Sequence, residues 1–159
     1  MLFIQERVCK LSEKHMNTFI RYTMFRRSLS VLGAYSWKDV PYVTECPHKL
    51  QALDISIPQR APLYAKLPTC VFVHGGAWQR GDKSAGLNKD IDAAFVRAGC
   101  LGVTVNYRLA PEVRHPTHVE DVAAAVTWLH WNVAKVELVN SSGFGRELTN
   151  VCISWTVWR

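Results

Sequence analysis

The sequence lacks several features that would place it in whole classes of protein. No apolar run reaches the roughly 20 residues that a membrane-spanning helix needs. The cysteines are odd in number and follow neither a disulfide framework nor metal-site spacing; they are Cys9, Cys46, Cys70, Cys100 and Cys152. We interpret them as free thiols and expect a cytoplasmic protein. Because His, Asp and Glu do not recur at ligand spacing, no metal is expected, and nothing in the sequence calls for a cofactor.

Little net positive charge lies outside the N-terminal segment. Residues 1–38 carry a net charge of +5, and residues 39–159 carry only +1 of the total of +6. The near-neutral body gives no sign of a nucleic-acid-binding face. The basic segment 1–37 is loosely helical and is interpreted as a solvated arm or lid. The alternative is a helix that lies on a membrane surface, giving peripheral membrane association, or that acts as a targeting signal.

What remains is an ordinary globular composition with 48% hydrophobic and 20% charged residues, enough for one core in 159 residues. Apolar and alternating runs predict an edge strand at 37–43 interrupted by Pro41, and a half-buried strand at 53–57. Two further apolar runs, at 70–73 and 101–105, predict buried strands.

Two amphipathic segments predict helices at 88–98 and 117–133. The first has Asn88 as its expected N-cap and Gly99 as its stop. Its expected buried face consists of Ile91, Ala94, Phe95 and Ala98. The second begins with a capping box of Thr117 and Glu120, and its expected buried stripe is Val119, Val122, Ala123, Val126, Leu129 and Val133. Strand, helix and strand in this order predict an α/β fold with a mostly parallel sheet.

The strand at 70–73 stops at His74, Gly75 and Gly76. Glycines just beyond a strand let backbone N–H groups approach another molecule closely, because no Cβ intervenes. N–H groups aimed at a developing negative oxygen form an oxyanion hole. The alternative is a tight turn without function.

Several motifs together give a resemblance over about residues 38–135. They are Asp-Ile-Ser-Ile-Pro at 54–58, His-Gly-Gly-Ala-Trp at 74–78, Gly-Asp-Lys at 81–83, Asn-Tyr-Arg-Leu-Ala-Pro-Glu at 106–112 and Glu-Asp-Val at 120–122. In this order they resemble the N-terminal half of an α/β-hydrolase-fold esterase. The most similar branches are the kynurenine formamidase and feruloyl-esterase-like group and the hormone-sensitive-lipase-like group.

The resemblance implies hydrolysis of carboxylic esters or aryl formamides by a Ser-Asp/Glu-His triad. It implies that the N–H groups of Gly76 and Ala77 are the oxyanion donors and that His74 and Gly75 support the loop. Trp78 would line the acyl pocket. Structural roles fall to the residues that tie the following loop to the second helix, namely Tyr107, Arg108 and Asp121.

The family pattern also requires a further strand and a G-x-S-x-G serine elbow after the second helix, and the sequence contains no G-x-S-x-G. Ser84 lies between Gly81 and Gly86, but this segment has one residue more than a G-x-S-x-G motif allows and lies in the wrong part of the chain. His115 and His118 are expected to be exposed and without a catalytic role, and the last histidine, His130, lies inside a helix pattern. We therefore expect a truncated, inactive hydrolase, with no catalytic residue present. The alternative is a non-catalytic binding or regulatory protein, such as one that pairs with a full-length hydrolase.

The last segment, 136–159, shows no helix stripe and no cap, so three parts are expected: the arm 1–37, a half hydrolase domain 38–135 and an aberrant tail. A Lys codon AAG followed by a Val codon would form an intron donor site, and our hypothesis is a retained intron or a mis-predicted gene end in a eukaryote. Such a tail should be loosely placed. Without the family's next strands, the sheet should have an unpaired edge that promotes self-association.

Overall fold

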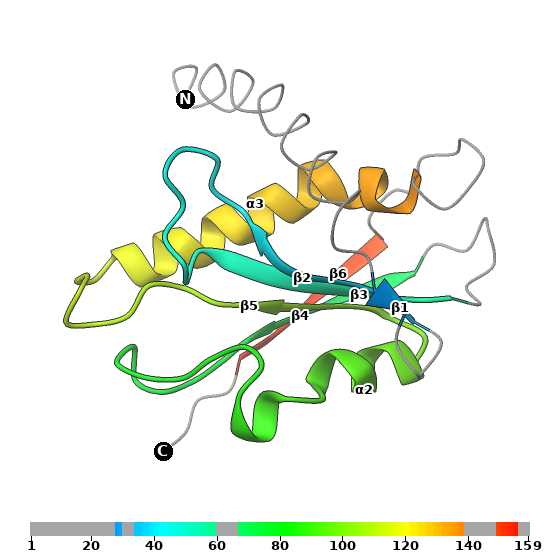
Figure 1. Cartoon of the computed structure of the whole chain (residues 1–159), viewed down its shortest axis with the longest axis horizontal. Coiled ribbons are helices and arrows are strands. Elements are labelled where there is room, and N and C mark those ends of the chain that lie inside the picture. Colours follow the sequence, from blue (N-terminus) through cyan, green and yellow to red (C-terminus); the bar gives the residue numbers. More distant parts are fainter. Residues whose placement is uncertain (1–27, 30–33, 60–66, 139–148, 156–159) are drawn as a thin grey trace.

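The computed structural model describes residues 28–29, 34–59, 67–138 and 149–155, and they form one sheet with a helix on either side (Figure 1). The strands, in chain order, are β1 (Ser28–Leu29), β2 (Ala34–Pro41), β3 (Ala52–Pro58), β4 (Pro68–Val73), β5 (Leu101–Val105) and β6 (Thr149–Trp155). The helices are α2 (Ile91–Arg97) and α3 (Thr117–Leu138), and a short 3-10 turn, η1 (Gly86–Asn88), precedes α2.

The sheet has six strands in the order β1-β2-β3-β5-β4-β6. β4 pairs in parallel with β5 on one side and with β6 on the other. The pairings of β1 with β2, β2 with β3 and β3 with β5 are antiparallel. The α/β class and the parallel β4–β5 pair are therefore confirmed, while the sheet as a whole is mixed.

α2 is shorter than the sequence predicted. Asp90, not Asn88, occupies its N-cap, because Asn88 ends the 3-10 turn and its Nδ2 donates to the Asp82 carbonyl at 2.9 Å. The expected stop is confirmed: Gly99 adopts φ +78°, and its N–H donates to the Val96 carbonyl. The N–H of the next residue donates to the Phe95 carbonyl, which completes a Schellman motif.

The buried face of α2 is rotated from the expected one. Ala94 and Ala98 are exposed, and Val96 is the buried residue. Asp92 also turns to the sheet, where its Oδ2 accepts hydrogen bonds from Lys38 Nζ at 2.7 Å and Ser56 Oγ at 3.0 Å. The two donors satisfy the hydrogen-bonding capacity of the Asp92 carboxylate on the side of α2 that contacts the sheet. Ala94 and Ala98 lie on the solvent side.

α3 differs from the expectation in the same way. The Glu120 N–H donates to the Pro116 carbonyl, so the predicted capping box does not form. Val119 is 42% exposed and Ala123 is exposed, whereas the buried face also contains polar residues. That face consists of His118, Asp121, Val122, Ala125, Trp128, Leu129 and Asn132. The side chain of Val133 lies outside the described residues.

The apolar core lies between the sheet and α3. Alternate residues of β3, β4 and β5 pack with residues of α3 in this core; the strand residues are Leu53, Ile55, Ile57, Val71, Val73, Leu101, Val103 and Val105. Each fully buried side chain of this size contributes about 1.5–3 kcal/mol. The expectation that β3 is half-buried is wrong, because α2 covers the second face, where Asp92 of the helix accepts a hydrogen bond from Ser56.

β2 is not an edge strand, since it pairs with both β1 and β3. Its register shifts between Trp37 and Val40, where Asp39 adopts φ +54°. This bulge turns the Lys38 and Asp39 side chains toward one charged cluster. Pro41 ends the strand and does not interrupt it.

The expected loose tail is wrong where the structure describes it, and among the described strands the edge of the sheet on this side is β6. β6 pairs with β4 from Pro68–Thr149 to Val73–Trp155, and β5 lies between β3 and β4. Residues 139–148 and 156–159 lie outside the described residues, as do 1–27 of the expected arm. Neither described helix combines the length and apolar character that a bilayer crossing requires.

Candidate active site: the loop after β4

The loop that follows β4 has an unusual backbone conformation. Gly76, Ala77 and Trp78 all have positive φ, at +122°, +52° and +62°. A non-glycine residue in this region costs on the order of 1–2 kcal/mol, and such residues cluster at functional sites. The structure thus places conformational strain in the His-Gly-Gly-Ala-Trp segment.

Gly76 cannot carry a side chain at this position. Its carbonyl accepts from the N–H groups of Gln79 and Arg80, both at 3.1 Å, and a Cβ would overlap the Arg80 carbonyl. Among the described residues, the N–H groups of Gly76 and Ala77 donate to no backbone carbonyl outside regular elements. Two adjacent donors are therefore held in a fixed turn and available to an acceptor.

His74 holds the first part of this loop. Its ring stacks on Tyr107 with centroids 4.4 Å apart, and its Nδ1 donates to the Gly75 carbonyl at 2.8 Å. The Tyr107 hydroxyl donates to the His74 carbonyl at 2.8 Å, and Gly81 lies against the His74 ring so closely that a Cβ would overlap Nδ1. Burial lowers the pKa of His74, so the ring stays neutral and acts as a packed support.

Trp78 packs among aromatic rings. Its ring lies edge-on to Tyr107 at 5.4 Å and 5.3 Å from His118, and its carbonyl accepts from the Ala110 N–H at 2.8 Å. The expectation that His118 is exposed is wrong: it is 3% exposed, and neither ring nitrogen has a partner among the described residues. His115 is exposed, as expected. The spacing of His118 with Val122 on α3 was the signal for its burial.

Arg108 and Asp121 join the loop after β5 to α3. Arg108 donates to Asp121 from its backbone N–H, from Nε at 2.8 Å and from Nη2 at 2.7 Å. Gln51 Nε2 adds a fourth bond at 2.9 Å. Burial alone would raise the pKa of Asp121, but these donors outweigh it, so its pKa is lowered. The buried carboxylate stays ionised and fixes the segment that carries Tyr107.

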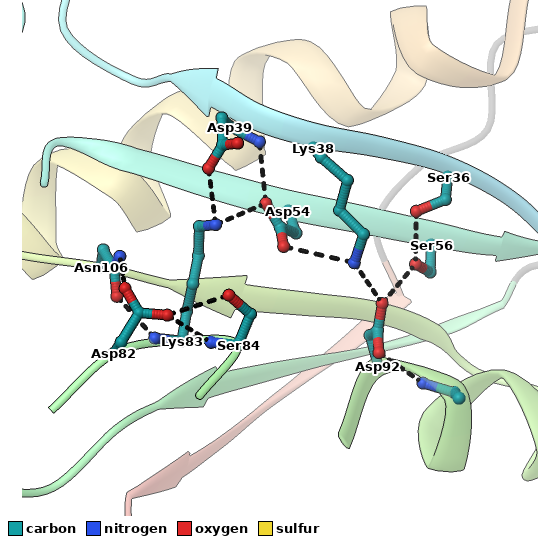
Figure 2. Close-up of polar contacts among 11 residues, drawn as sticks. Ser36, Lys38, Asp39, Asp54, Ser56, Asp82, Lys83, Ser84, Asp92 and Asn106 are labelled. Atoms are coloured by element: carbon teal, nitrogen blue, oxygen red, sulfur yellow. Dashed lines mark hydrogen bonds and ion pairs between the residues drawn. The ribbon is translucent and has the colours of Figure 1, made fainter. Parts of the chain in front are cut away.

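A second polar cluster fixes the far end of the loop after β4 (Figure 2). Asn106 Nδ2 donates to Asp82 Oδ2 at 2.8 Å, while the Lys83 N–H donates to Asn106 Oδ1 at 2.6 Å. Ser84 donates to Asp82 Oδ1 from both N–H and Oγ. Burial opposes ionisation of Asp82, yet the bonds from Ser84 and Asn106 lower its pKa.

Lys83 is the anchor of this cluster and was not found by sequence reasoning. Its side chain is 4% exposed, and Nζ lies 2.8 Å from Asp54 on β3 and 2.8 Å from Asp39 on the β2 bulge. Burial alone would lower the pKa of Lys83, but these two carboxylates raise it. The signal was Asp54, a charged residue on the polar face of an alternating strand pattern.

No nucleophile and base come together in the described part of the chain. Ser84 Oγ is bonded to Asp82, and no His, Cys, Asp or Glu groups of three or more could hold a metal ion there. β6 does supply the further strand that the resemblance requires after α3, and it lies beside β4. The residues after it, 156–159, contain no serine.

Solved structures with the same fold define the class of the protein. Esterase B from Lactobacillus rhamnosis matches 97% of this chain with a TM-score of 0.64 at 19% identity, and the match covers 43% of that chain. A thermophilic PNB esterase matches 81% of this chain with a TM-score of 0.61 and 20% identity, covering 36% of that chain. The fold is therefore that of the α/β-hydrolase esterases.

Sequence comparison gives the family. The BD-FAE family model matches residues 53–142, and the chain belongs to the BD-FAE family of α/β-hydrolase-fold proteins. Kynurenine formamidase of Meyerozyma guilliermondii is 36% identical over 75 residues, and probable carboxylesterase 5 of Arabidopsis thaliana is 40% identical over 65 residues. These matches cover 45% and 40% of this chain. The expected resemblance is confirmed.

The chain spans only part of these curated relatives. It covers 28% of the kynurenine formamidase and 20% of the carboxylesterase. Hydrolase 3 of Catharanthus roseus is matched over 67% of this chain and 32% of its own length, at 34% identity.

Proposed function

We propose that the loop at residues 74–78 is the oxyanion hole of a hydrolase that acts on carboxylic esters or aryl formamides. The observation that carries this proposal is the run of positive φ at Gly76, Ala77 and Trp78, which leaves two neighbouring N–H groups without a backbone acceptor. The Tyr107 and Lys83 contacts hold both ends of that loop in place. Preorganised donors of this kind need no rearrangement as charge develops.

The chemistry of this half is stabilisation of an acyl-transfer intermediate. As a nucleophile adds to an ester or formamide carbonyl, the carbonyl oxygen becomes negative and accepts hydrogen bonds from the N–H groups of Gly76 and Ala77. One such donor contributes about 2.7–4 kcal/mol in a well-studied protease. Trp78, which lies beside this turn, would line the pocket for the acyl or formyl group.

We also propose that the chain as given is a truncated hydrolase that does not complete a catalytic cycle. An oxyanion hole retains only a small fraction of enzymatic rate enhancement when nucleophile and base are missing. The sequence offers no G-x-S-x-G, and the Ser84 hydroxyl donates to the Asp82 carboxylate, with no hydrogen bond to an imidazole of the described residues.

An NMR titration tests the oxyanion hole without requiring turnover. Methylphosphonate, a tetrahedral anion, is added to the uniformly labelled chain. We expect the amide signals of Gly76 and Ala77 to shift in a saturable way, while those of Gly86 and Gly99 do not, although these glycines also have positive φ. Equal shifts at all four amides, or none at Gly76, would contradict the proposal.

A separate activity assay tests the proposed inactivity. p-Nitrophenyl acetate and N-formylkynurenine should be hydrolysed at the rate of the buffer alone, and a fluorophosphonate probe should label no serine. Stoichiometric labelling of any serine, Ser84 included, would overturn the inactive assignment and leave the oxyanion titration unaffected.

We further propose a cytoplasmic location. The described cysteines are free thiols, which persist in a reducing compartment. Cell fractionation of the full chain should find it in the high-speed supernatant. Recovery with membranes would favour the peripheral association that the basic arm 1–37 raised as the alternative.

A further inference from the structure

Three of the free cysteines gather on one face of the sheet. Cys70 of β4 is the direct register partner of Cys152 of β6, and on its other side it pairs with Gly102 of β5. Cys100 lies two residues before Gly102 and follows the C-terminus of α2. Directly paired residues of parallel strands point to the same face of a sheet.

That face is the one α2 covers. A Cβ on Gly102 would lie 3.0 Å from the Asp92 carbonyl oxygen and 3.1 Å from Phe95 Cβ, so Gly102 faces α2, and its partner Cys70 faces the same way. Cys152 shares this face through its pairing with Cys70. The opposite face holds the apolar core under α3.

The thiols differ in accessibility. Cys152 is exposed, whereas Cys70 is half-buried. Burial raises the pKa of the Cys70 thiol to about 11, and the nearby thiols of Cys100 and Cys152 add to this rise. Cys70 is therefore protonated near neutral pH, and an oxidant meets Cys152 first.

We propose that Cys70 and Cys152 form a peroxide-sensitive dithiol whose disulfide fastens β6 to β4. Neighbouring strands lie about 4.8 Å apart, within the Cα separation of about 4.4–6.8 Å that disulfides span, and forming the bond requires the two side chains to lean together until their Cβ atoms are about 3.5–4.5 Å apart. This inference is independent of the proposed oxyanion hole, because no hydrolase residue takes part.

The oxidant is hydrogen peroxide, and the reaction has two steps. The Cys152 thiolate attacks one peroxide oxygen, the O–O bond breaks, and hydroxide leaves as sulfenic acid forms on Cys152. The Cys70 sulfur then attacks the sulfenic sulfur; the S–O bond breaks, and water leaves with the proton from Cys70. The two sulfurs together lose two electrons, which reduce the peroxide.

The disulfide is tested in a C9S/C46S background, which keeps only the three clustered thiols. After peroxide treatment, remaining thiols are alkylated, and tryptic peptides are mapped without reduction. The three cysteines fall in different tryptic peptides, so each pairing has its own mass. We expect the free-thiol count to fall from three to one, with Cys70 linked to Cys152.

Matched variants separate the roles of the three thiols. Adding C100S should leave the Cys70–Cys152 peptide unchanged, and adding C70S should abolish it and increase dimedone trapping of Cys152. The same protein unfolded in urea should give a mixture of pairings. A Cys70–Cys100 link in the folded protein, no disulfide, or the same mixture with and without urea would each overturn the proposal.

Discussion

Gly76 shows how a single residue can decide whether the candidate site forms. Its φ of +122° is open to glycine alone, and its missing side chain makes room for the Arg80 carbonyl. Gly86 also has positive φ, at +58°, but a Cβ there would meet nothing within 4 Å. A side chain added at Gly86 would therefore introduce backbone strain alone, whereas one added at Gly76 would introduce both backbone strain and steric overlap.

We predict that Gly76→Ala destabilises the fold by about 3 kcal/mol or more, the sum of backbone strain and overpacking. Gly86→Ala should cost only about 1–2 kcal/mol, because it adds strain alone. Urea unfolding, followed by far-UV circular dichroism, measures both free energies. Equal losses for the two variants would show that the Arg80 carbonyl moves aside at little cost.

Lys83 connects three elements that are distant in the sequence. It lies in the loop after β4 and contacts β3 through Asp54 and the β2 bulge through Asp39. Lys38, on β2, contacts Asp54 from the other side, but its side chain is 46% exposed. Burial distinguishes the two lysines, since both lie beside the same carboxylate.

We predict that Lys83→Met destabilises the fold by about 3–5 kcal/mol, because it leaves the buried Asp54 carboxylate with the Asp39 N–H and, as its one remaining cation among the described residues, the partly exposed Lys38. Lys38→Met should cost about 1 kcal/mol or less, as expected for an exposed ion pair. Chemical denaturation of both variants gives the comparison. If Lys38→Met proves the more costly change, Asp54 depends on Lys38 and the proposed anchoring by Lys83 is wrong.

The positions of the helices and strands were predicted better than the residues that each helix buries. The strands at β4 and β5 followed from short apolar runs, and the end of α2 followed from Gly99, because these signals are local. The helix faces did not follow, since Asp92 and Asp121 look like surface residues in sequence. Their burial depends on Lys38 and Arg108, which come from other elements.

The site was predictable to a similar degree. The His-Gly-Gly-Ala-Trp segment was predicted from its glycines at a strand end. The burial of Lys83 and of His118 was not predicted. The burial of Lys83 depends on a bulge in β2, and that of His118 on how α3 is rotated. Neither is encoded by residues nearby in the chain.

Across the whole molecule, buried ionisable groups make the fold sensitive to acid. The pKa of His74 is lowered, chiefly by burial, so this ring is neutral when folded and gains a proton more readily when unfolded. The carboxyls of Asp82, Asp92 and Asp121 also have lowered pKa values, because their hydrogen-bond donors and cationic partners outweigh burial. All four groups bind fewer protons in the folded state than in the unfolded state at low pH.

We predict two stages of acid destabilisation. Stability should begin to fall as pH drops below about 6.5, where unfolded His74 takes up a proton. It should fall more steeply below about pH 4, where unfolded carboxyls are protonated and the folded ones are not. Urea midpoints across this range measure both stages. His74→Phe should flatten the first stage and Asp121→Asn part of the second; unchanged profiles would exclude these groups as the cause.

The position of β6 has a consequence for how the chain folds during synthesis. β4 pairs with β5 early, but its other side is filled by a strand that is translated only after α3. At about 5–20 residues per second, the interval is on the order of ten seconds. During that time β4, which is an inner strand of the final sheet, is an edge strand, and a ribosome-associated chaperone that shields strand edges would act most effectively within this interval.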